Sequence, residues 1–446
     1  MARGPEDEAP PLAAATATMD AQAAASGARR TMRDHLRPLR FYGWVIGGVG
    51  FVVNMLFGAM MFHAFGTYVV LLREDFGWSA TSFSLAFALM RIESGLLGPI
   101  EGWAIDRFGP RAIMRVGVVL FSIGLIGLSF INSLFGFYIV FLVMALGSAL
   151  GAFLPISVAI VNWFDRRRAA ALTLLSLGFS AGGLIQPLIV GGLEYYGWRQ
   201  MSLMMGLLVL VVGLPLAQLV LHHPESHGYL PDGDSPEEHA RRNSGREEIE
   251  FTARQALRTR AFWMISLGQS ASLLVFGAVS VHFVAYMTET LEMTKGAAAG
   301  IIALMTLMTV IGQLVFGGLL GDHVNKLLVI VLAMFAHTVA LLILAFGMST
   351  AWVAAFAIIN GLAMGTRGPL MQALRAEYFG RRSFGTIMGF SSLVMMFGIV
   401  IGPLVAGLSY DMLGEYRPGF ILLAVLSALG SVFFMLTKPP AVPAAT

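Results

Sequence analysis

The sequence predicts an all-α membrane protein whose twelve transmembrane helices form two pseudo-symmetric six-helix bundles. Composition is the first observation: 57% of the residues are hydrophobic and 12% are charged, against roughly 25% charged in a soluble globular chain. The second observation is a series of apolar runs of about 20 residues, the length that an α-helix needs to cross a bilayer. The third is an internal repeat, because short motifs recur about 215 residues apart.

The apolar runs divide the chain into six spans per half. In the first half the spans lie near residues 42–71, 79–105, 112–131, 134–161, 170–193 and 200–221. In the second half they lie near residues 262–287, 297–320, 327–348, 351–374, 384–408 and 418–437. We expect a disordered cytoplasmic N-terminal tail (1–40), an N-terminal bundle (41–221), a cytoplasmic linker (222–260), a C-terminal bundle (261–437) and a cytoplasmic C-terminal tail (438–446).

Three motifs of the first half return in the second half. They are Gly102-x3-Asp106 (as Gly318-x3-Asp322), Gly147-x3-Gly151-x3-Pro155 (as Gly361-x3-Gly365-x3-Pro369) and Phe164-x-Arg166-Arg167 (as Phe379-x-Arg381-Arg382). Two duplicated apolar halves are typical of membrane transporters, in which the substrate is held where the halves meet.

Basic residues predict the orientation, because Lys and Arg are retained on the cytoplasmic side. With both termini inside, the cytoplasmic segments carry 23 of the 29 Lys and Arg, and the outer loops carry four. The inverted topology would reverse this bias. We therefore expect a multi-pass protein of the cell (inner) membrane with both termini in the cytoplasm.

Several classes of function lack their signatures. The chain contains no cysteine, which excludes disulfides and thiolate metal sites, and it has no Walker loop, dinucleotide fingerprint or zinc-ligand spacing. We expect no enzyme activity, no cofactor and no metal. The net charge of +3 reflects the basic cytoplasmic side, so we expect no nucleic-acid partner. The expected partners are a small anionic solute and membrane lipid, and the expected state is a monomer.

The loop after the second span carries the motif Gly102-x3-Asp106-Arg107-x-Gly109-x-Arg111. This motif resembles the signature of the major facilitator superfamily, and the resemblance extends over residues 40–437. Other short marks are similar to the monocarboxylate-porter and oxalate/formate-antiporter branch: Phe76-Gly77-Trp78-Ser79, Trp163-Phe164 with Arg166–Arg168, Gly197-Trp198-Arg199 and Phe262-Trp263. Animal members of that branch have a lysine in helix 1 and an Asp/Arg pair in helix 8. Here helix 1 offers only His63, and helix 8 (297–320) has no charge.

Arg367 is the first candidate for binding an anion. An arginine inside a span costs about 2.5–3.5 kcal/mol on insertion scales, so it is normally retained for a partner or a function. Its matched residue in the first half is Phe153. The resemblance implies that helices 1, 4, 7 and 10 line the central cavity, which would bring Arg367 of helix 10 to an anionic substrate, and its planar fork suits a carboxylate. The alternative is pairing with helix-end carbonyls or an acid, for stability or gating.

Arg91 lies in helix 2 on a stripe of small residues that continues through Gly95, Gly98 and Gly102, so it is expected to face protein rather than lipid. It is a candidate substrate ligand or a member of an internal charge network. Glu93 lies two residues away on another side of the helix and shares a face with Glu101; we assign Glu93 to conformational gating.

Further candidates for the substrate site are polar side chains of helices 1, 7 and 10. Histidine titrates near neutral pH, so a proton relay or a substrate hydrogen bond is one interpretation; hydrogen bonding within the bundle is the other. These residues are His63, Tyr68, His282, Tyr286 and Asn360.

The resemblance implies that Asp106, with nearby arginines such as Arg107 and Arg111, latches helix ends together on the cytoplasmic side, and that Asp322 keeps the acidic position in the second half. The alternative is that these charges only set topology.

We therefore expect a secondary-active transporter of a small organic anion, working by alternating access and coupled to a proton or to an exchanged solute. One alternative is an efflux pump for amphipathic compounds. Another is a membrane sensor or scaffold that does not transport.

Overall fold

The computed structural model describes residues 41–243, 249–347 and 349–441. The expected tail 1–40 and the last residues of the C-terminal tail lie outside the described residues. Within the described ranges the chain forms helices, turns and loops, and no strand is present.

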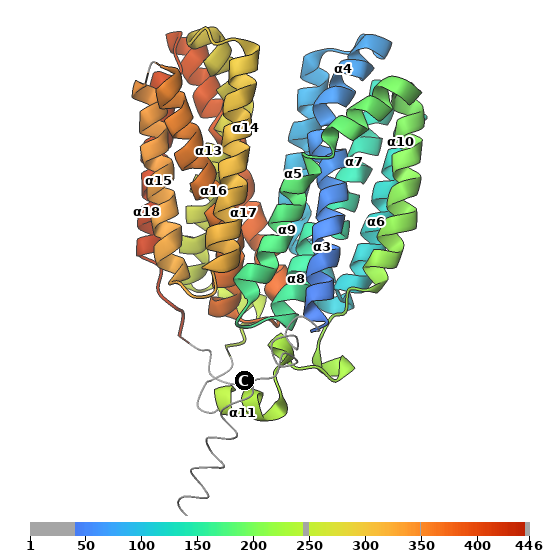
Figure 1. The fold of residues 1–446 in the computed structure, drawn as a ribbon, viewed down its shortest axis with the longest axis vertical. Coiled ribbons are helices and arrows are strands. Elements are labelled where there is room, and N and C mark those ends of the chain that lie inside the picture. The colour runs from blue at the N-terminus through green and yellow to red at the C-terminus, as the bar shows by residue number, and fades with distance from the viewer. Residues whose placement is uncertain (1–40, 244–248, 348, 442–446) are drawn as a thin grey trace, which may run out of the picture.

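The helices form two bundles that stand side by side (Figure 1). The first bundle contains α3 (Gly43–Phe57), η2 (Gly58–His63), α4 (Phe65–Phe76), α5 (Ala80–Phe108), α6 (Pro110–Leu128), α7 (Leu134–Gly151), α8 (Phe153–Trp163), α9 (Arg168–Gly182) and α10 (Gln186–Gln218). The second contains α13 (Arg260–Ala285), η5 (Tyr286–Thr290), α14 (Lys295–Gly312), η6 (Gln313–Leu319), α15 (Lys326–Phe346), α16 (Thr350–Phe379), α17 (Phe384–Leu413) and α18 (Arg417–Met435). The short helices η3 (Glu225–His227), η4 (Pro231–Gly233), α11 (Pro236–Asn243) and α12 (Ala253–Leu257) lie between the bundles in sequence.

The described residues contain ten helical segments that are long and apolar enough to cross a membrane. One of them, Arg168–Gln218, is 51 residues long and turns at Gly197, whose φ of 77° is a backbone conformation that glycine adopts without strain. It therefore supplies two spans. The remaining span is α16, whose arginines and glutamate lower its hydropathy. The predicted all-α fold with six helices in each half is confirmed.

Five helices differ in detail from the simple spans that the sequence predicts. Helix 1 contains a π-helical turn, η2, and helices 7 and 8 end in the π-helical segments η5 and η6. Such turns depend on local packing, so the hydropathy of the sequence does not predict them. Helix 4 is divided into α7 and α8 at Ala152 (φ −125°, ψ −100°). Helix 10 continues to Phe379 instead of ending near residue 374.

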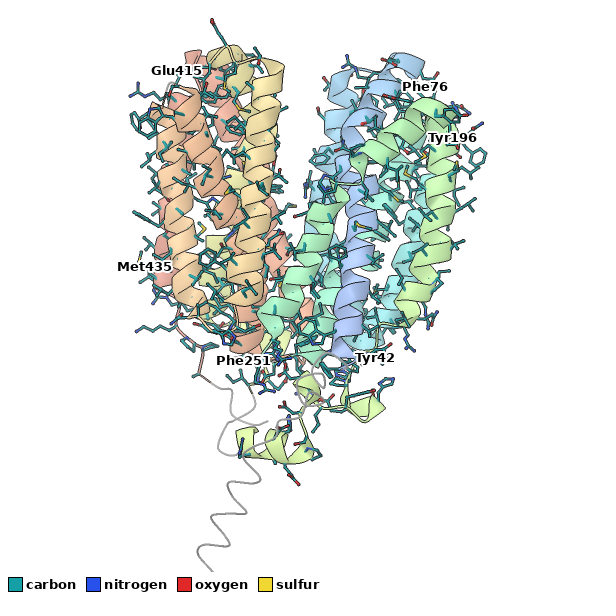
Figure 2. All side chains as sticks on the ribbon, viewed as in Figure 1. Tyr42, Phe76, Tyr196, Phe251, Glu415 and Met435 are labelled. Atoms are coloured by element: carbon teal, nitrogen blue, oxygen red, sulfur yellow. The ribbon has the colours of Figure 1, made fainter. Side chains whose placement is uncertain are left out.

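The two bundles contact each other mainly at one end, which we call the linker end because residues 219–259 join the bundles there; toward the other end their ribbons diverge (Figure 1). Tyr42 and Phe251 lie at the linker end, and Phe76, Tyr196 and Glu415 lie toward the opposite end (Figure 2). The contact between the bundles therefore closes the linker end.

A glycine seam between α5 and α17 forms part of this contact. A Cβ atom added to Gly102 would lie 2.0 Å from the carbonyl oxygen of Gly385, and one added to Gly389 would lie 2.0 Å from that of Gly98. Both distances are far shorter than a van der Waals contact. The two helices can approach this closely only because both carry glycine along the seam.

Candidate functional site

A cavity of about 140 Å³ lies inside the second bundle, between α13, α14, α15 and α16. Its apolar wall includes Phe276, Phe283 and Ile302, and its polar lining includes Ser272, His337, Asn360 and Arg367. The volume is sufficient for several water molecules or for a small organic solute. An apolar wall with a few convergent polar groups is typical of a ligand site.

Arg367 is the charged residue of this cavity. Its side chain is 5% exposed, and its Nε and Nη1 atoms are buried without a hydrogen-bond partner. No carboxylate forms an ion pair with it among the described residues. A buried charge that lacks both a counterion and hydrogen bonds is costly, so an anion that enters the cavity would meet donors with no competing partner.

His337 and Asn360 form a second polar element of the same cavity. Nδ1 of His337 lies 2.9 Å from Oδ1 of Asn360, and Nδ2 of Asn360 lies 3.6 Å from the sulfur of Met305. His337 Nε2 and Ser272 Oγ are buried without a partner. Three side chains, including Arg367, thus present unpaired polar atoms around one small volume.

His337 and Arg375 were not among the residues predicted from the sequence. Arg375 is 1% exposed, and both of its terminal nitrogens lack a partner. The predicted end of helix 10 near residue 374 leaves Arg375 outside the span, whereas the helix continues to Phe379. The spacing of eight residues between Arg367 and Arg375, which puts both on one helix face, is the signal that would have identified Arg375.

Arg91 occupies the first bundle and does not line this cavity. Its guanidinium carbon lies 4.9 Å from the ring centroid of Phe87 and 5.5 Å from that of Phe62, within the range of cation–π attraction. Its Nε has no hydrogen-bond partner. Glu93 accepts a hydrogen bond from Ser94 Oγ at 3.2 Å rather than pairing with Arg91.

The other predicted polar residues form hydrogen bonds within their own bundle. Nε2 of His63 lies 3.1 Å from the carbonyl oxygen of Phe179, and Nε2 of His282 lies 3.0 Å from that of Pro403. The hydroxyl of Tyr68 lies 3.0 Å from Ser202 Oγ, and that of Tyr286 donates to the carbonyl of Leu344 at 3.0 Å. Of the residues predicted to bind substrate, the structure brings Arg367 and Asn360 together in one cavity.

Asp106, at the linker end of α5, binds the first turn of α17 in the other bundle. It accepts hydrogen bonds from Gly385 N at 2.9 Å, from Thr386 N at 2.7 Å and from Thr386 Oγ1 at 2.6 Å. The first amides of a helix have no intrahelical acceptor and carry a partial positive charge. This explains why the carboxylate binds backbone amides and not the nearby arginines. Arg107 lies near the ring of Trp103, and Arg111 donates a hydrogen bond to the carbonyl oxygen of Val220 at 3.3 Å.

Asp322 makes the reciprocal contact. It accepts hydrogen bonds from Ala169 N at 2.8 Å and Ala170 N at 3.1 Å, in the first turn of α9. Burial raises the pKa of this carboxyl, and the two backbone hydrogen bonds oppose that effect. Each bundle therefore supplies one aspartate that caps a helix of the other bundle, and we call these two contacts the aspartate latches.

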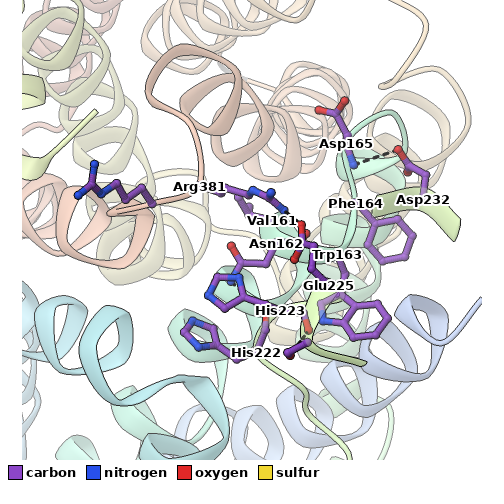
Figure 3. A network of polar contacts seen from close by, with 12 residues as sticks. Val161, Asn162, Trp163, Phe164, Asp165, His222, His223, Glu225, Asp232 and Arg381 are labelled. Atoms are coloured by element: carbon purple, nitrogen blue, oxygen red, sulfur yellow. Dashed lines mark hydrogen bonds and ion pairs between the residues drawn. The ribbon is translucent and has the colours of Figure 1, made fainter. Parts of the chain in front are cut away.

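The linker between the bundles binds the duplicated loops that follow α8 and α16. Asp232 Oδ2 accepts hydrogen bonds from Asp165 N at 3.2 Å and Arg166 N at 2.8 Å, and Glu225 forms an ion pair with Arg381 at 2.7 Å (Figure 3). A larger cavity of about 880 Å³ lies at this end, but several of its cations are engaged: Arg166, Arg168, Lys326 and Arg381 all form ion pairs.

Comparison with known proteins agrees with this architecture. The profile of the Major Facilitator Superfamily matches residues 50–355 and 265–446. Human Monocarboxylate transporter 11 is 26% identical over 90% of this chain and 84% of its own length. Monocarboxylate transporter 3 of Rattus norvegicus is 27% identical over 89% and 80%, respectively.

A further relative is the Membrane sensor protein UhpC of Salmonella typhimurium, 28% identical over 56% of each chain. Among solved structures, the E. coli fucose:proton symporter FucP superposes with a TM-score of 0.67 at 15% identity, and it covers 90% of this chain and all of its own. The human organic anion transporter MFSD10 gives a TM-score of 0.62, also at 15% identity, over 91% of this chain and all of its own. The profile match over most of the sequence confirms the predicted resemblance, and the chain belongs to the Major Facilitator Superfamily.

Proposed function

We propose that this protein is a secondary-active transporter of a small organic anion, with a monocarboxylate as the preferred class, and that Arg367 is its main anion-binding group. The observation that carries the proposal is a guanidinium buried in a small cavity with two unpartnered nitrogens. A carboxylate would accept two charge-assisted hydrogen bonds from such a fork. The apolar wall of the cavity suits the short hydrocarbon part of a monocarboxylate.

The names of the relatives support the substrate class. Two of them are monocarboxylate transporters that match most of this chain. Animal members of the monocarboxylate-porter branch have an Asp/Arg pair in helix 8, but helix 8 of this chain has no charged residue between positions 297 and 320. We therefore assign anion binding to Arg367 of helix 10.

The transport cycle that we propose is alternating access. The aspartate latches and the glycine seam hold the linker end closed, so the described state would load its solute from the opposite end. Release would require Asp106 and Asp322 to leave the helices that they cap, and a gradient of the solute, of protons or of an exchanged solute would drive the cycle.

The orientation that we propose places both termini and residues 222–260 in the cytoplasm of the inner membrane, with the protein acting as a monomer. The basic bias of the sequence supports it. The chain has no cysteine, so Ser235→Cys gives a single label site in the linker. An impermeant maleimide should label it only in permeabilised cells, and labelling in intact cells would invert the proposed topology.

The test of the proposed function is binding of acetate, lactate and pyruvate to purified, monodisperse protein. Arg367→Ala should weaken binding roughly ten- to a hundredfold, the value of a charge-assisted hydrogen bond. Arg367→Lys should recover only part of the affinity, because it keeps the charge and loses the fork. Arg73→Ala, at an exposed arginine outside the site, is the matched control.

Unchanged affinity in Arg367→Ala would move the anion site to Arg91. Unchanged affinity in both arginine variants would end the organic-anion proposal and favour the efflux of an amphipathic compound. Because one relative is a membrane sensor, uptake into proteoliposomes decides between transport and sensing: a sensor would bind the solute without moving it.

A further inference from the structure

The cavity beside Arg367 contains a second titratable group, the imidazole of His337, near the middle of α15. The side chain is 2% exposed. Its Nδ1 faces Oδ1 of Asn360 at 2.9 Å, and because an amide oxygen only accepts, Nδ1 carries the hydrogen. Nε2 therefore carries the lone pair, and it is buried without a partner.

We propose that His337 takes up a proton when a carboxylate binds at Arg367, so that the solute and the proton cross the membrane as a pair. This inference rests on the proposed function. The lone pair of Nε2 would repel a carboxylate oxygen, whereas a protonated Nε2 would donate a hydrogen bond to it. The positive charge of Arg367 disfavours a second cation until the anion arrives. Anion and proton binding therefore favour each other by the same factor.

The charge of the site supports this pairing. The empty site carries the single positive charge of Arg367. The loaded site would carry Arg367, a protonated His337 and one carboxylate, which again leaves one net positive charge. The proton comes from water, and no bond of the carboxylate is made or broken. Because the net charge is the same in both forms, loading adds no charge to the membrane interior.

The helices around His337 offer few competing groups. Residues 418–435 of α18 and 296–312 of α14 contain no titratable side chain. On α13, His282 is held by the carbonyl of Pro403, and Arg260 begins the helix at the linker end. On α16, Arg375 and Glu377 lie more than two turns beyond Asn360, and Glu377 pairs with Lys326 at 2.6 Å. Arg367 is the charged group that acts on His337.

The experiment measures proton uptake during binding of acetate, lactate or pyruvate to the full-length protein. Calorimetric titration at pH 7 in two buffers of different ionisation enthalpy gives the number of protons taken up per anion. We expect about one proton, and an affinity that falls about tenfold for each unit of rising pH, as uptake of one proton requires. His337→Gln should abolish proton uptake and make the affinity independent of pH between 6 and 8.

Two variants are matched controls. His227→Gln and His323→Gln replace exposed imidazoles outside the cavity, and both should keep the proton uptake of the parent. His337→Asn is the second variant if His337→Gln does not purify as a monodisperse protein.

Proton uptake that persists in the His337 variants would assign the proton to another group and overturn the inference. Carboxylate binding that depends on Arg367 but takes up no proton in the unmodified protein would also overturn it, while leaving the proposed function intact. Failure of all three carboxylates to bind the unmodified protein would overturn both.

Discussion

Helix 4 and helix 10 occupy matched places in the two halves, yet they differ at the point where the substrate site is proposed. Helix 4 breaks into α7 and α8 at Ala152, and Phe153 beside the break is 39% exposed. Helix 10 is the continuous α16, and the matched Arg367 is 5% exposed. Both helices keep the proline of the repeated motif, so proline alone does not decide whether the helix breaks.

The packing of the repeated glycines differs as well. A Cβ atom on Gly361 would lie 2.5 Å from the carbonyl oxygen of Met305 in α14, whereas one on the matched Gly147 would lie 2.3 Å from the backbone nitrogen of Phe121 in α6. The same motif therefore faces helix 8 in one half and helix 3 in the other. The glycines of the motif are therefore retained in both halves, but they pack against different helices. The buried Arg367 lies in the half in which the motif helix is continuous.

The largest effect should come from filling the contact between α16 and α14. Gly365→Ala would force the two helices apart, because the atom that its Cβ would meet at 1.9 Å, the carbonyl oxygen of Thr309, is backbone and cannot rotate away. We expect a loss of about 3 kcal/mol in stability, read as a lower melting temperature of the purified protein. Gly48→Ala, on a helical glycine with nothing within 4 Å, should be neutral or stabilising. Equal melting temperatures for the two variants would show that the contact is not rigid.

An exchange of the matched residues tests whether the arginine or its surroundings make the site. Arg367→Phe should lose roughly ten- to a hundredfold in carboxylate affinity. Adding Phe153→Arg should not restore it, because the broken helix 4 has no counterpart of His337 and Asn360 beside residue 153. Recovery of affinity in the double variant would show that the halves are interchangeable.

The two aspartate latches should differ in strength. Asp106 accepts three hydrogen bonds and Asp322 accepts two. Asp106→Asn should destabilise the state that is closed at the linker end by about 1 kcal/mol, which lowers its population relative to the open state roughly fivefold. Transport turnover should be slower, while the affinity for substrate stays near normal. Asp322→Asn should have smaller effects. The labelling rate of a cysteine introduced at Ser176, beside Gly368, reports opening. Parental rates of labelling and transport in Asp106→Asn would contradict the latch.

The smallest expected effect concerns the linker. Burial lowers the pKa of His222 to about 4, with His223 as a second cause, and burial also lowers the pKa of His223. The neutral forms are thus favoured in the folded linker, so its attachment should be complete above about pH 6.5 and weaken as the pH falls toward 4. A spin label at Ser235→Cys should gain mobility over this range. The double change of His222 and His223 to Gln should remove the pH dependence, while His227→Gln, outside the buried pair, should keep it.

The sequence could predict the twelve spans because a bilayer leaves few options for an apolar chain. Each backbone group must be satisfied within its own helix, so length and hydropathy locate the spans. The break at Ala152 and the π-helical turns could not be predicted, because they depend on how neighbouring helices pack. The predicted end of helix 10 lies several residues before its observed end at Phe379, because Arg375 interrupts the apolar run.

Arg367 and the two latch aspartates were predictable because a charge stands out in an apolar chain. Asn360 was predictable because it is a polar side chain on a helix that the resemblance brings to the cavity. His337 is the single polar titratable residue in the middle of an apolar helix. Its importance comes from its contact with Asn360 and from its position in the cavity, and both depend on how different helices pack together. The roles of Arg367, Arg91, His63 and His282 remain predictions, and the proposed binding experiments address the two arginines.

The glycine seam has a consequence for leakage. A Cβ atom on Gly102 or on Gly389 would meet only backbone atoms of the other helix, while the side chains of Ser392 and Asp106 fill the space beside Gly98 and Gly385. At the two backbone contacts, rotation of a side chain therefore opens no path for water or protons. Passage at these two contacts requires α5 itself to move away from α17, so we expect this part of the barrier to open by movement of a helix.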